Sequence, residues 1–206
     1  MDRLLEKLPL RGGSWLEPGA GEGNIVKAVK RLDVRWTALE LRAECRPHLE
    51  LLVPRPEIII TDKFVSPGLP EEQKPLHGRR FDVALGNPPF TLDEEFVEES
   101  MKLADTVVML LRLNFIGSSG RCAFMQKHPP DVYVLPDRPS FDGRGTDSIE
   151  YAWFVWQSGA RSRDAGRVTV LNTTPVAVRS EIRRQHELQH AQAALRTCKP
   201  DLATRS

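Results

Sequence analysis

A loop with closely spaced Glu17, Gly19, Gly21 and Gly23 lies between a short apolar segment and a helix-like one. Glycine permits a positive φ and lets a ligand approach the backbone, and open α/β sheets bind nucleotide-type ligands at such a loop. A dinucleotide site would have glycine where Asn24 stands, and the Gly-Lys-Ser/Thr of a P-loop is absent. A carboxylate at Glu17 would repel a pyrophosphate but suits an ammonium group. The loop therefore predicts a site for a nucleotide-like ligand with a positive charge.

A second feature is the corner Asn87-Pro88-Pro89-Phe90, which directly follows an apolar segment. The two prolines lack backbone donors and have a fixed φ, so the corner is rigid and poor in N–H groups. Taken alone, it is equally consistent with a strand-ending turn that buries Phe90 and with a binding site.

Short apolar segments alternate along the chain with helix-like stretches. They predict strands at residues 14–16, 36–40, 57–60, 81–86, 106–113, 132–135, 151–156 and 168–171. This alternation predicts an α/β fold, with a mostly parallel sheet of about seven strands and helices on both faces. Only a polar turn separates the last two segments, so we expect them to form an antiparallel edge hairpin.

Two helices position the loop and the corner. Ile25, Ala28, Val29 and Leu32 have helical spacing, which predicts a helix directly after the glycine loop. Residues 91–94 match a capping box and predict a second helix that runs from the corner to about residue 104.

The glycine loop and the acids that follow it resemble the motifs of S-adenosylmethionine-dependent methyltransferases, whose cofactor has a cationic methionine end and no phosphate. The resemblance covers about residues 13–157 and implies a Rossmann-like methyltransferase fold. It implies that Glu40 holds the ribose hydroxyls, that Asp62 accepts from the adenine amino group, and that Phe64 packs on the adenine ring. The implied cofactor-binding set is Glu17, Pro18, Gly19, Gly21, Gly23, Asn24, Glu40, Leu41, Asp62, Phe64 and Asn87.

The corner matches the (Asn/Asp/Ser)-Pro-Pro-aromatic motif of methyltransferases that act on amino or amide nitrogens. The resemblance implies that the Asn87 side-chain oxygen and the Pro88 carbonyl hold both N–H bonds of the target amine, so that its lone pair points at the methyl group. Phe90 would then stack on an extruded base. The implied catalytic residues are Asn87, Pro88, Pro89 and Phe90, in a direct transfer without a metal or a cysteine nucleophile.

The closing segments resemble those of small adenine-specific DNA methyltransferases, including compact bacteriophage forms. This implies DNA as the partner and Phe141 as a second aromatic contact to the base. Arg121 and Arg138 lie on loops near the carboxyl ends of the predicted strands, so we expect them to contact the phosphate backbone of the substrate. RNA methyltransferases that act on adenine or guanine amino groups share the corner and remain an alternative, as does a cofactor-binding subunit without turnover. Glutamine-amide methyltransferases of release factors are disfavoured, because an extra helical domain precedes their glycine loop.

The bulk properties are those of an ordinary globular protein, with 206 residues, 40% hydrophobic, 28% charged and a net charge of +1. No apolar run is long enough to predict a membrane span. The cysteines Cys45, Cys122 and Cys198 are widely spaced, which favours reduced thiols, a cytoplasmic location and no zinc site. The resemblance to small DNA methyltransferases implies that this cytoplasm is that of a bacterial or phage-infected cell. We expect a methyltransferase domain over residues 1–175 and a basic tail over 176–206, which can track phosphates or form a solvated helix. The oligomeric state is left open.

Overall fold

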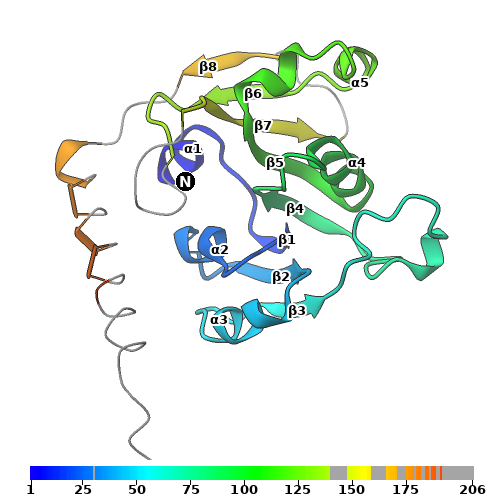
Figure 1. Cartoon of the computed structure of the whole chain (residues 1–206), viewed down its shortest axis with the longest axis horizontal. Helices are drawn as coiled ribbons and strands as arrows, with labels where there is room; N and C mark the ends of the chain where they lie inside the picture. Colours follow the sequence, from blue (N-terminus) through cyan, green and yellow to red (C-terminus); the bar gives the residue numbers. More distant parts are fainter. Residues whose placement is uncertain are drawn as a thin grey trace, which may run out of the picture.

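The computed structural model describes residues 1–29, 31–139, 148–158, 166–170, 175–178, 180–181, 184–185, 187–188 and 191. Its described part is built on one eight-stranded sheet (Figure 1). The strands are β1 (Gly13–Pro18), β2 (Val34–Glu40), β3 (Glu57–Ile60), β4 (Phe81–Gly86), β5 (Ala104–Arg112), β6 (Asp131–Val134), β7 (Tyr151–Gln157) and β8 (Val168–Val170). All eight correspond to the predicted strands, and their ends differ from the predicted ones by at most two residues.

Helices connect most of these strands. The α-helices are α1 (Asp2–Lys7), α2 (Asn24–Ala28), α3 (Arg46–Glu50), α4 (Asp93–Leu103) and α5 (Cys122–Lys127). Short 3-10 helices lie at η1 (Ala43–Cys45), η2 (Glu71–Gln73) and η3 (Leu113–Gly117). Most of these helices have only one or two turns, so packing on the sheet must supply most of their stability.

The strand order is β3-β2-β1-β4-β5-β7-β6-β8. The strand β7 runs antiparallel to both of its neighbours, and all other pairs are parallel. The order reverses at β1, which lies between β2 and β4. In an open sheet, such a reversal leaves a crevice beyond the carboxyl ends of the strands. The predicted mostly parallel sheet is confirmed.

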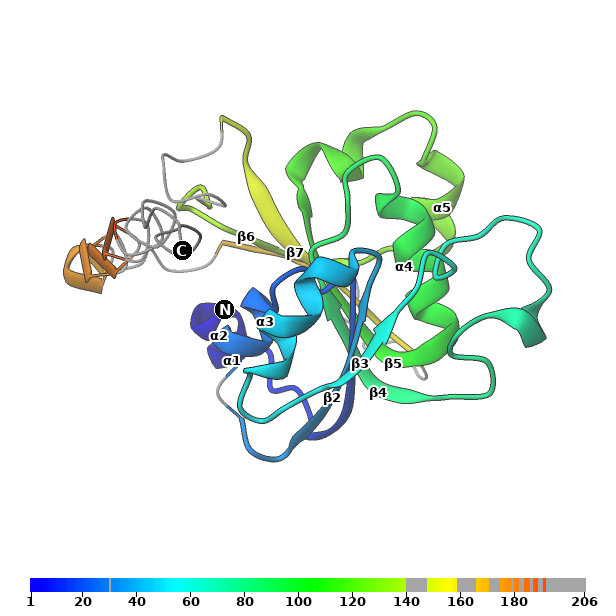
Figure 2. The ribbon, with the colours of Figure 1, turned by 60° about the horizontal axis from the view of Figure 1, so that its bottom comes forward.

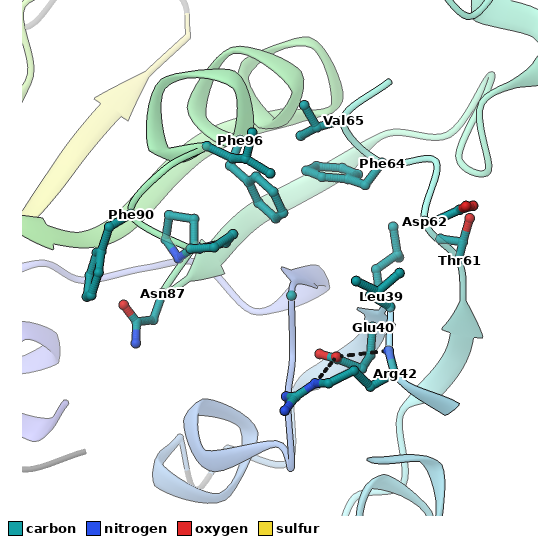
Figure 3. A pocket seen from close by; sticks show the side chains of 15 residues that line it. Leu39, Glu40, Arg42, Thr61, Asp62, Phe64, Val65, Asn87, Phe90 and Phe96 are labelled. Atoms are coloured by element: carbon teal, nitrogen blue, oxygen red, sulfur yellow. Dashed lines mark hydrogen bonds and ion pairs between the residues drawn. The ribbon is translucent and has the colours of Figure 1, made fainter. Parts of the chain in front are cut away.

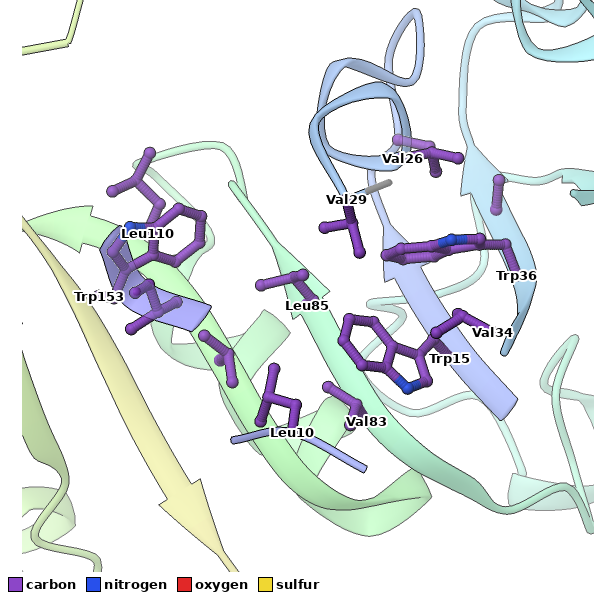
Figure 4. Close-up of a cluster of buried hydrophobic side chains, with 14 of the residues drawn as sticks. Leu10, Trp15, Val26, Val29, Val34, Trp36, Val83, Leu85, Leu110 and Trp153 are labelled. Carbon is purple, nitrogen blue, oxygen red and sulfur yellow. The ribbon is translucent and has the colours of Figure 1, made fainter. Parts of the chain in front are cut away.

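The helices cover both faces of the sheet and divide the core in two. On one face, α1, α2 and α3 pack over a cluster in which the rings of Trp15 and Trp36 meet edge to face, with centroids 5.3 Å apart (Figures 2 and 4). On the other face, α4 and α5 cover a cluster that contains Phe115, Phe154 and Trp156. Because both faces are covered, most residues of β4 and β5 are buried, which explains their apolar sequences.

The antiparallel hairpin has different partners from those expected. The strand β7 pairs with β5 and β6, whereas β8 pairs in parallel with β6 and not with β7. The sequence shows only that β7 and β8 are close in the chain, and the pairing depends on side-chain burial. Residues 151–156 are all buried, so β7 takes an internal position in the sheet rather than an edge.

Two details of the predicted helices are also wrong. The helix after the glycine loop ends at Ala28, and Leu32 lies 92% exposed in the turn before β2. The capping box does not form, because α4 begins at Asp93 and has no side-chain cap hydrogen bond. The Asp93 carboxylate instead accepts from the N–H of Glu94 and from the Arg121 guanidinium, so a contact distant in sequence fixes the start of this helix.

The carboxylate of Asp82 joins the starts of β1 and β4. Its Oδ2 atom accepts from the Ser14 N–H at 2.7 Å and from the Ser14 hydroxyl at 2.9 Å, and these bonds hold the pKa of Asp82 below its ordinary value. We expect Asp82→Ala to lower the free energy of unfolding by about 1–3 kcal/mol at pH 7, as for other lost bonds to a charged group. Urea unfolding followed by circular dichroism measures this loss.

The same experiment has a control and a pH test. Asp105→Ala removes an exposed carboxylate that pairs with Arg80, and such pairs contribute about 1 kcal/mol or less. A lowered pKa stabilises the fold above the unfolded value, about 3.9, and this contribution is lost as the pH falls through the folded value. The deficit of Asp82→Ala should therefore shrink below about pH 4. Equal losses in the two variants would contradict the role given to Asp82.

Candidate active site

The loop between β1 and α2 turns through three glycines in the left-handed region, with φ of 72° at Gly19, 56° at Gly21 and 76° at Gly23. Gly23 is the N-cap of α2, and a Cβ atom there would lie 2.4 Å from Leu52 Cδ1. The loop can therefore keep this turn and its packing against the segment after α3 only with glycine at this position. Gly19 is exposed and lines a cavity beyond the strand ends.

The carboxylate of Glu40, at the end of β2, connects this loop to its neighbouring strand (Figure 3). Its Oε2 atom accepts from the Gly21 N–H at 2.6 Å, and its Oε1 atom accepts from the N–H and the Nε–H of Arg42 at 3.1 and 2.8 Å. Burial opposes ionisation of this carboxyl, but these hydrogen bonds and the charge of Arg42 outweigh it and lower its pKa. Glu40 is therefore a charged acceptor at the base of the loop.

The second acid of the loop has the opposite environment. The side chain of Glu17, at the end of β1, is only 2% exposed, and its Oε2 atom has no hydrogen-bond partner among the described residues. Burial raises the pKa of Glu17 well above its ordinary value, and the nearby charge of Glu40 adds to this, against a hydrogen bond from the Val26 backbone. A buried carboxyl with a free oxygen is poised to accept a cation or a donor that the described residues do not supply.

The Asn-Pro-Pro-Phe corner follows β4 and lies across the cavity from Glu40 (Figure 3). Asn87 lines the cavity, and its Oδ1 atom is buried without a hydrogen-bond partner in the described part of the chain. Pro88 is buried, and the Pro89 carbonyl accepts from the Leu92 N–H at 2.9 Å, which fixes the turn. Phe90 is half-buried and also lines the cavity. The corner thus presents a vacant acceptor beside an aromatic ring.

The cavity has a volume of about 630 Å³ and lies at the carboxyl ends of β1 to β4. This volume is in the range of small-molecule and cofactor sites, about 300–1,000 Å³. Nine of the predicted site residues line it: Gly19, Glu40, Leu41, Asp62, Phe64, Asn87, Pro88, Pro89 and Phe90. The fold therefore brings the loop, the two later acids and the corner to one cavity.

Six lining residues were not predicted: Leu39, Arg42, Thr61, Val65, Leu92 and Phe96. Phe96 packs against Phe64 with ring centroids 5.1 Å apart, and together they form an aromatic wall (Figure 3). Phe96 lies in the first turn of α4, and a helix that starts at the corner must place that turn next to the corner. This position is a signal from which Phe96 could have been predicted. Arg42, two residues after Glu40, gave no comparable signal.

The other predicted residues lie outside the cavity lining. Glu17 and Pro18 are buried beneath the loop, Gly21 and Gly23 shape its backbone, and Asn24 is exposed on α2. Arg138 forms an ion pair with Glu150, and both side chains are about half exposed. The remaining prediction, Phe141, lies outside the described residues.

Arg121 does not face solvent as a free cation. It pairs with Asp93 at 2.8 Å and with Glu94 at 3.4 Å, and its guanidinium carbon lies 4.5 Å from the centroid of the Phe115 ring. These contacts argue against the substrate contact predicted for it. They also offset part of the negative charge of Asp93 and Glu94 at the start of α4, and Lys74 and Lys102 pair with Glu99 in the middle of this helix.

The fold and the site can be compared with known proteins. No protein-family model matches the sequence, and a sequence search against curated proteins finds no match. Solved methyltransferase structures are similar in fold at low sequence identity. A chain from Listeria monocytogenes assigned to the class I S-adenosylmethionine-dependent methyltransferases superposes with a TM-score of 0.58 at 13% identity, over 90% of this chain and 66% of the other.

Two further structures extend this comparison. A predicted O-methyltransferase from Agrobacterium tumefaciens gives a TM-score of 0.57 at 19% identity, over 82% of this chain and 83% of the other. The 23S rRNA methyltransferase ErmE gives 0.53 at 19% identity, over 96% and 81%. The chain therefore has the fold of the class I S-adenosylmethionine-dependent methyltransferases.

The described residues lack two further features, a membrane-spanning helix and a cluster of metal ligands. None of their helices is long and apolar enough to cross a bilayer. They also contain no group of three or more His, Cys, Asp or Glu side chains placed to hold a metal ion.

The raised pKa of Glu17 gives a test that needs no ligand. Because its pKa is higher in the folded chain than in the unfolded one, the fold loses stability as the pH rises above the unfolded value, about 4.3. Glu17→Gln should remove this penalty and raise Tm near pH 7, and the gain should vanish near pH 4. Calorimetry between pH 4 and 8 measures it, with the exposed Glu22→Gln as control. A difference in Tm that does not vary with pH would contradict the burial of an ionisable group at this position.

Proposed function

We propose that this chain transfers a methyl group from S-adenosylmethionine to the exocyclic amino group of adenine in DNA. The observation that carries the proposal is the buried Oδ1 atom of Asn87, which has no hydrogen-bond partner among the described residues and lies at a cavity of cofactor size beside Phe90. Leaving such an acceptor without a partner costs free energy, and an incoming N–H group would recover it. An amino group on a planar base supplies both the donor and a face for stacking.

We orient the cofactor by the residues that line the cavity, where Glu40 would hold the ribose hydroxyls. Glu17 lies beneath the loop and outside the cavity lining, so its free oxygen would meet the ammonium group of the methionine end only after the loop moves. The aromatic wall of Phe64 and Phe96 provides an apolar surface for the adenine ring, with Asp62 at the same end of the cavity (Figure 3). Both Glu40 oxygens already accept hydrogen bonds, so the ribose would compete with Arg42 for Oε1.

The proposed chemistry is a direct in-line transfer. The amino nitrogen of adenine is a poor nucleophile because its lone pair is delocalised into the ring. Hydrogen bonds from its two N–H groups to Asn87 and to the Pro88 carbonyl would draw the nitrogen towards tetrahedral geometry and point the lone pair at the methyl group. The prolines set the direction of that carbonyl before the substrate arrives, and such preorganisation is a main source of catalysis. The proton leaves after transfer, so no general base is required.

RNA is the second candidate substrate. The likeness in fold to an rRNA methyltransferase is consistent with it, and the amino group of adenine in RNA would enter the same corner by the same chemistry. The basic tail predicted for residues 176–206 would attract either polymer, and it lies mostly outside the described residues. The predicted cytoplasmic location and the boundary near residue 175 remain predictions.

The proposal is tested by incubating the full chain with tritiated S-adenosylmethionine and DNA, RNA or protein in parallel. The labelled product is then digested and its nucleosides are separated. Labelled N6-methyladenine from DNA supports the proposal, and labelled RNA nucleosides support the second candidate. Label in protein alone, or in none of the three, would overturn both.

Cofactor binding gives a separate prediction. S-adenosylhomocysteine should stabilise the fold by about 2.7 kcal/mol at a hundredfold excess over Kd. Glu40→Gln keeps the size of the side chain but removes the charge that would hold the ribose, so the same ligand concentration should raise Tm much less. The exposed Glu44→Gln, three residues from the cavity-lining Leu41, should respond like the wild type. An equal shift in all three proteins would contradict the role of Glu40.

The corner gives another prediction. Asn87→Ala removes one acceptor for the target amine and leaves the rest of the cavity lining in place. Because that hydrogen bond would strengthen in the transition state, kcat should fall on the order of 100-fold while the affinity for S-adenosylhomocysteine changes little. Single-turnover transfer and calorimetric titration measure the two effects, with the exposed Asn114→Ala as control. Near-normal transfer by Asn87→Ala would mean that the corner is only a turn.

A further inference from the structure

Arg112, the last residue of β5, projects beside the Asn-Pro-Pro-Phe corner. The strand β5 pairs in parallel with β4, and Gly86 faces Met109 in the register. The backbone of β4 then turns into the corner while β5 continues for three more residues. On its other side, Arg112 pairs in register with Tyr151 of β7. Arg112 therefore reaches the corner from a neighbouring strand rather than from a loop.

The guanidinium of Arg112 stacks on the ring of Phe90. Its carbon lies 3.9 Å from the ring centroid, whereas the guanidinium carbons of Arg31, Arg79 and Arg121 lie 4.5 to 5.4 Å from the centroids of their aromatic partners. The Arg112 Nε atom is buried and has no hydrogen-bond partner in the described part of the chain. The chain thus gives up solvation of this donor to keep the planar group against the ring, a cost that the stacking must offset.

A third group completes the packing around Phe90. The ring of Tyr151, which is fully buried, lies 5.9 Å from the Phe90 ring centroid at an angle of 50°. Phe90 still lines the cavity, whereas Arg112 does not. Arg112 and Tyr151 therefore hold the ring from outside the cavity, and its remaining surface is available to a ligand inside.

We propose that Arg112 is a positioning residue for the target base, which would stack on Phe90 from the cavity side to form a guanidinium–ring–base stack. This inference rests on the proposed function. A ring that is already held in place loses little conformational freedom when the base arrives. A cation on its outer face also draws π-electron density from the ring, which favours stacking with an electron-rich neutral purine on the inner face.

A phosphate contact would need different properties from the same side chain. Lysine serves a phosphate nearly as well as arginine does as a point charge, but it lacks the planar group that stacks. The half-burial of Arg112 and its stacking on Phe90 favour the positioning role. The two roles can therefore be separated by an Arg→Lys exchange that keeps the charge.

The test compares Arg112→Lys and Arg112→Ala with the wild type in methyl transfer to DNA. We expect both variants to lose kcat/KM on the order of tenfold, with a raised KM for DNA, while the shift in Tm with S-adenosylhomocysteine stays that of the wild type. The exposed Arg46→Lys on α3 is the matched control. Transfer by Arg112→Lys near the wild-type level would overturn the inference. The slope of log K for DNA binding against log salt concentration is a second criterion. If it falls by about 0.9 in Arg112→Ala but not in Arg112→Lys, Arg112 contacts a phosphate and the inference is overturned.

Two further measurements show whether Arg112 and Phe90 act as one stack. Combining Arg112→Lys with Phe90→Leu should lower kcat/KM little more than either change alone, because both changes break one stack. Additive losses would contradict a shared role.

In the ¹⁵N-arginine-labelled full chain, the Arg112 Nε–H signal should be shifted by the ring current of Phe90 and return to its ordinary position in Phe90→Leu. An unshifted signal in the wild type would overturn the stack itself. Methylation of neither DNA nor RNA by the wild type would overturn the proposed function and this inference with it, whereas transfer by Arg112→Lys near the wild-type level would overturn the inference alone.

Discussion

The candidate site depends on the position of β1 between β2 and β4. Because these strands are parallel, their carboxyl ends meet at one edge of the sheet, and the connections leave towards opposite faces. The glycine loop, the acid of β2 and the corner of β4 are brought together by this one arrangement. The 2.6 Å hydrogen bond from the Gly21 N–H to Glu40 then holds the loop against β2. A change of strand order would separate residues that lie up to 70 positions apart in the chain.

Charge is distributed unevenly around the cavity. Two glutamates near it, Glu40 and Glu17, differ in how easily they ionise. Hydrogen bonds keep Glu40 ionised, whereas burial favours the neutral form of Glu17. The acids at the start of α4 would otherwise repel a polyanion near the corner, but Arg121 pairs with two of them. The field at the mouth of the cavity is therefore weaker than the sequence suggests, since acids and bases that are distant in the chain pair with one another.

Much of the fold and part of the site could be predicted from the sequence. The strands were found because helices cover both faces of the sheet, which makes each strand a short apolar run. The cavity residues that follow strand ends, such as Glu40 and Asn87, were found because strand ends share one edge. The pairing of β8, the start of α4 and the ion pairs of Arg121 were missed or wrong. Each of these depends on contacts between distant segments, which local patterns do not encode.

The internal position of β7 sets the order in which the sheet can form. The strands β1 to β5 can pair once residue 112 is available, but β6 pairs, within the described part of the chain, only with β7 and with the short β8. The pairing of β5 with β7 joins residues that are far apart in sequence, from Arg112 with Tyr151 to Thr106 with Gln157, and such long-range pairing raises the contact order and slows folding. Until β7 pairs, β5 has an exposed apolar edge, which is a hazard for association with other chains. Tyr151 begins β7, so the packing around Phe90 is completed only when β7 has paired with β5.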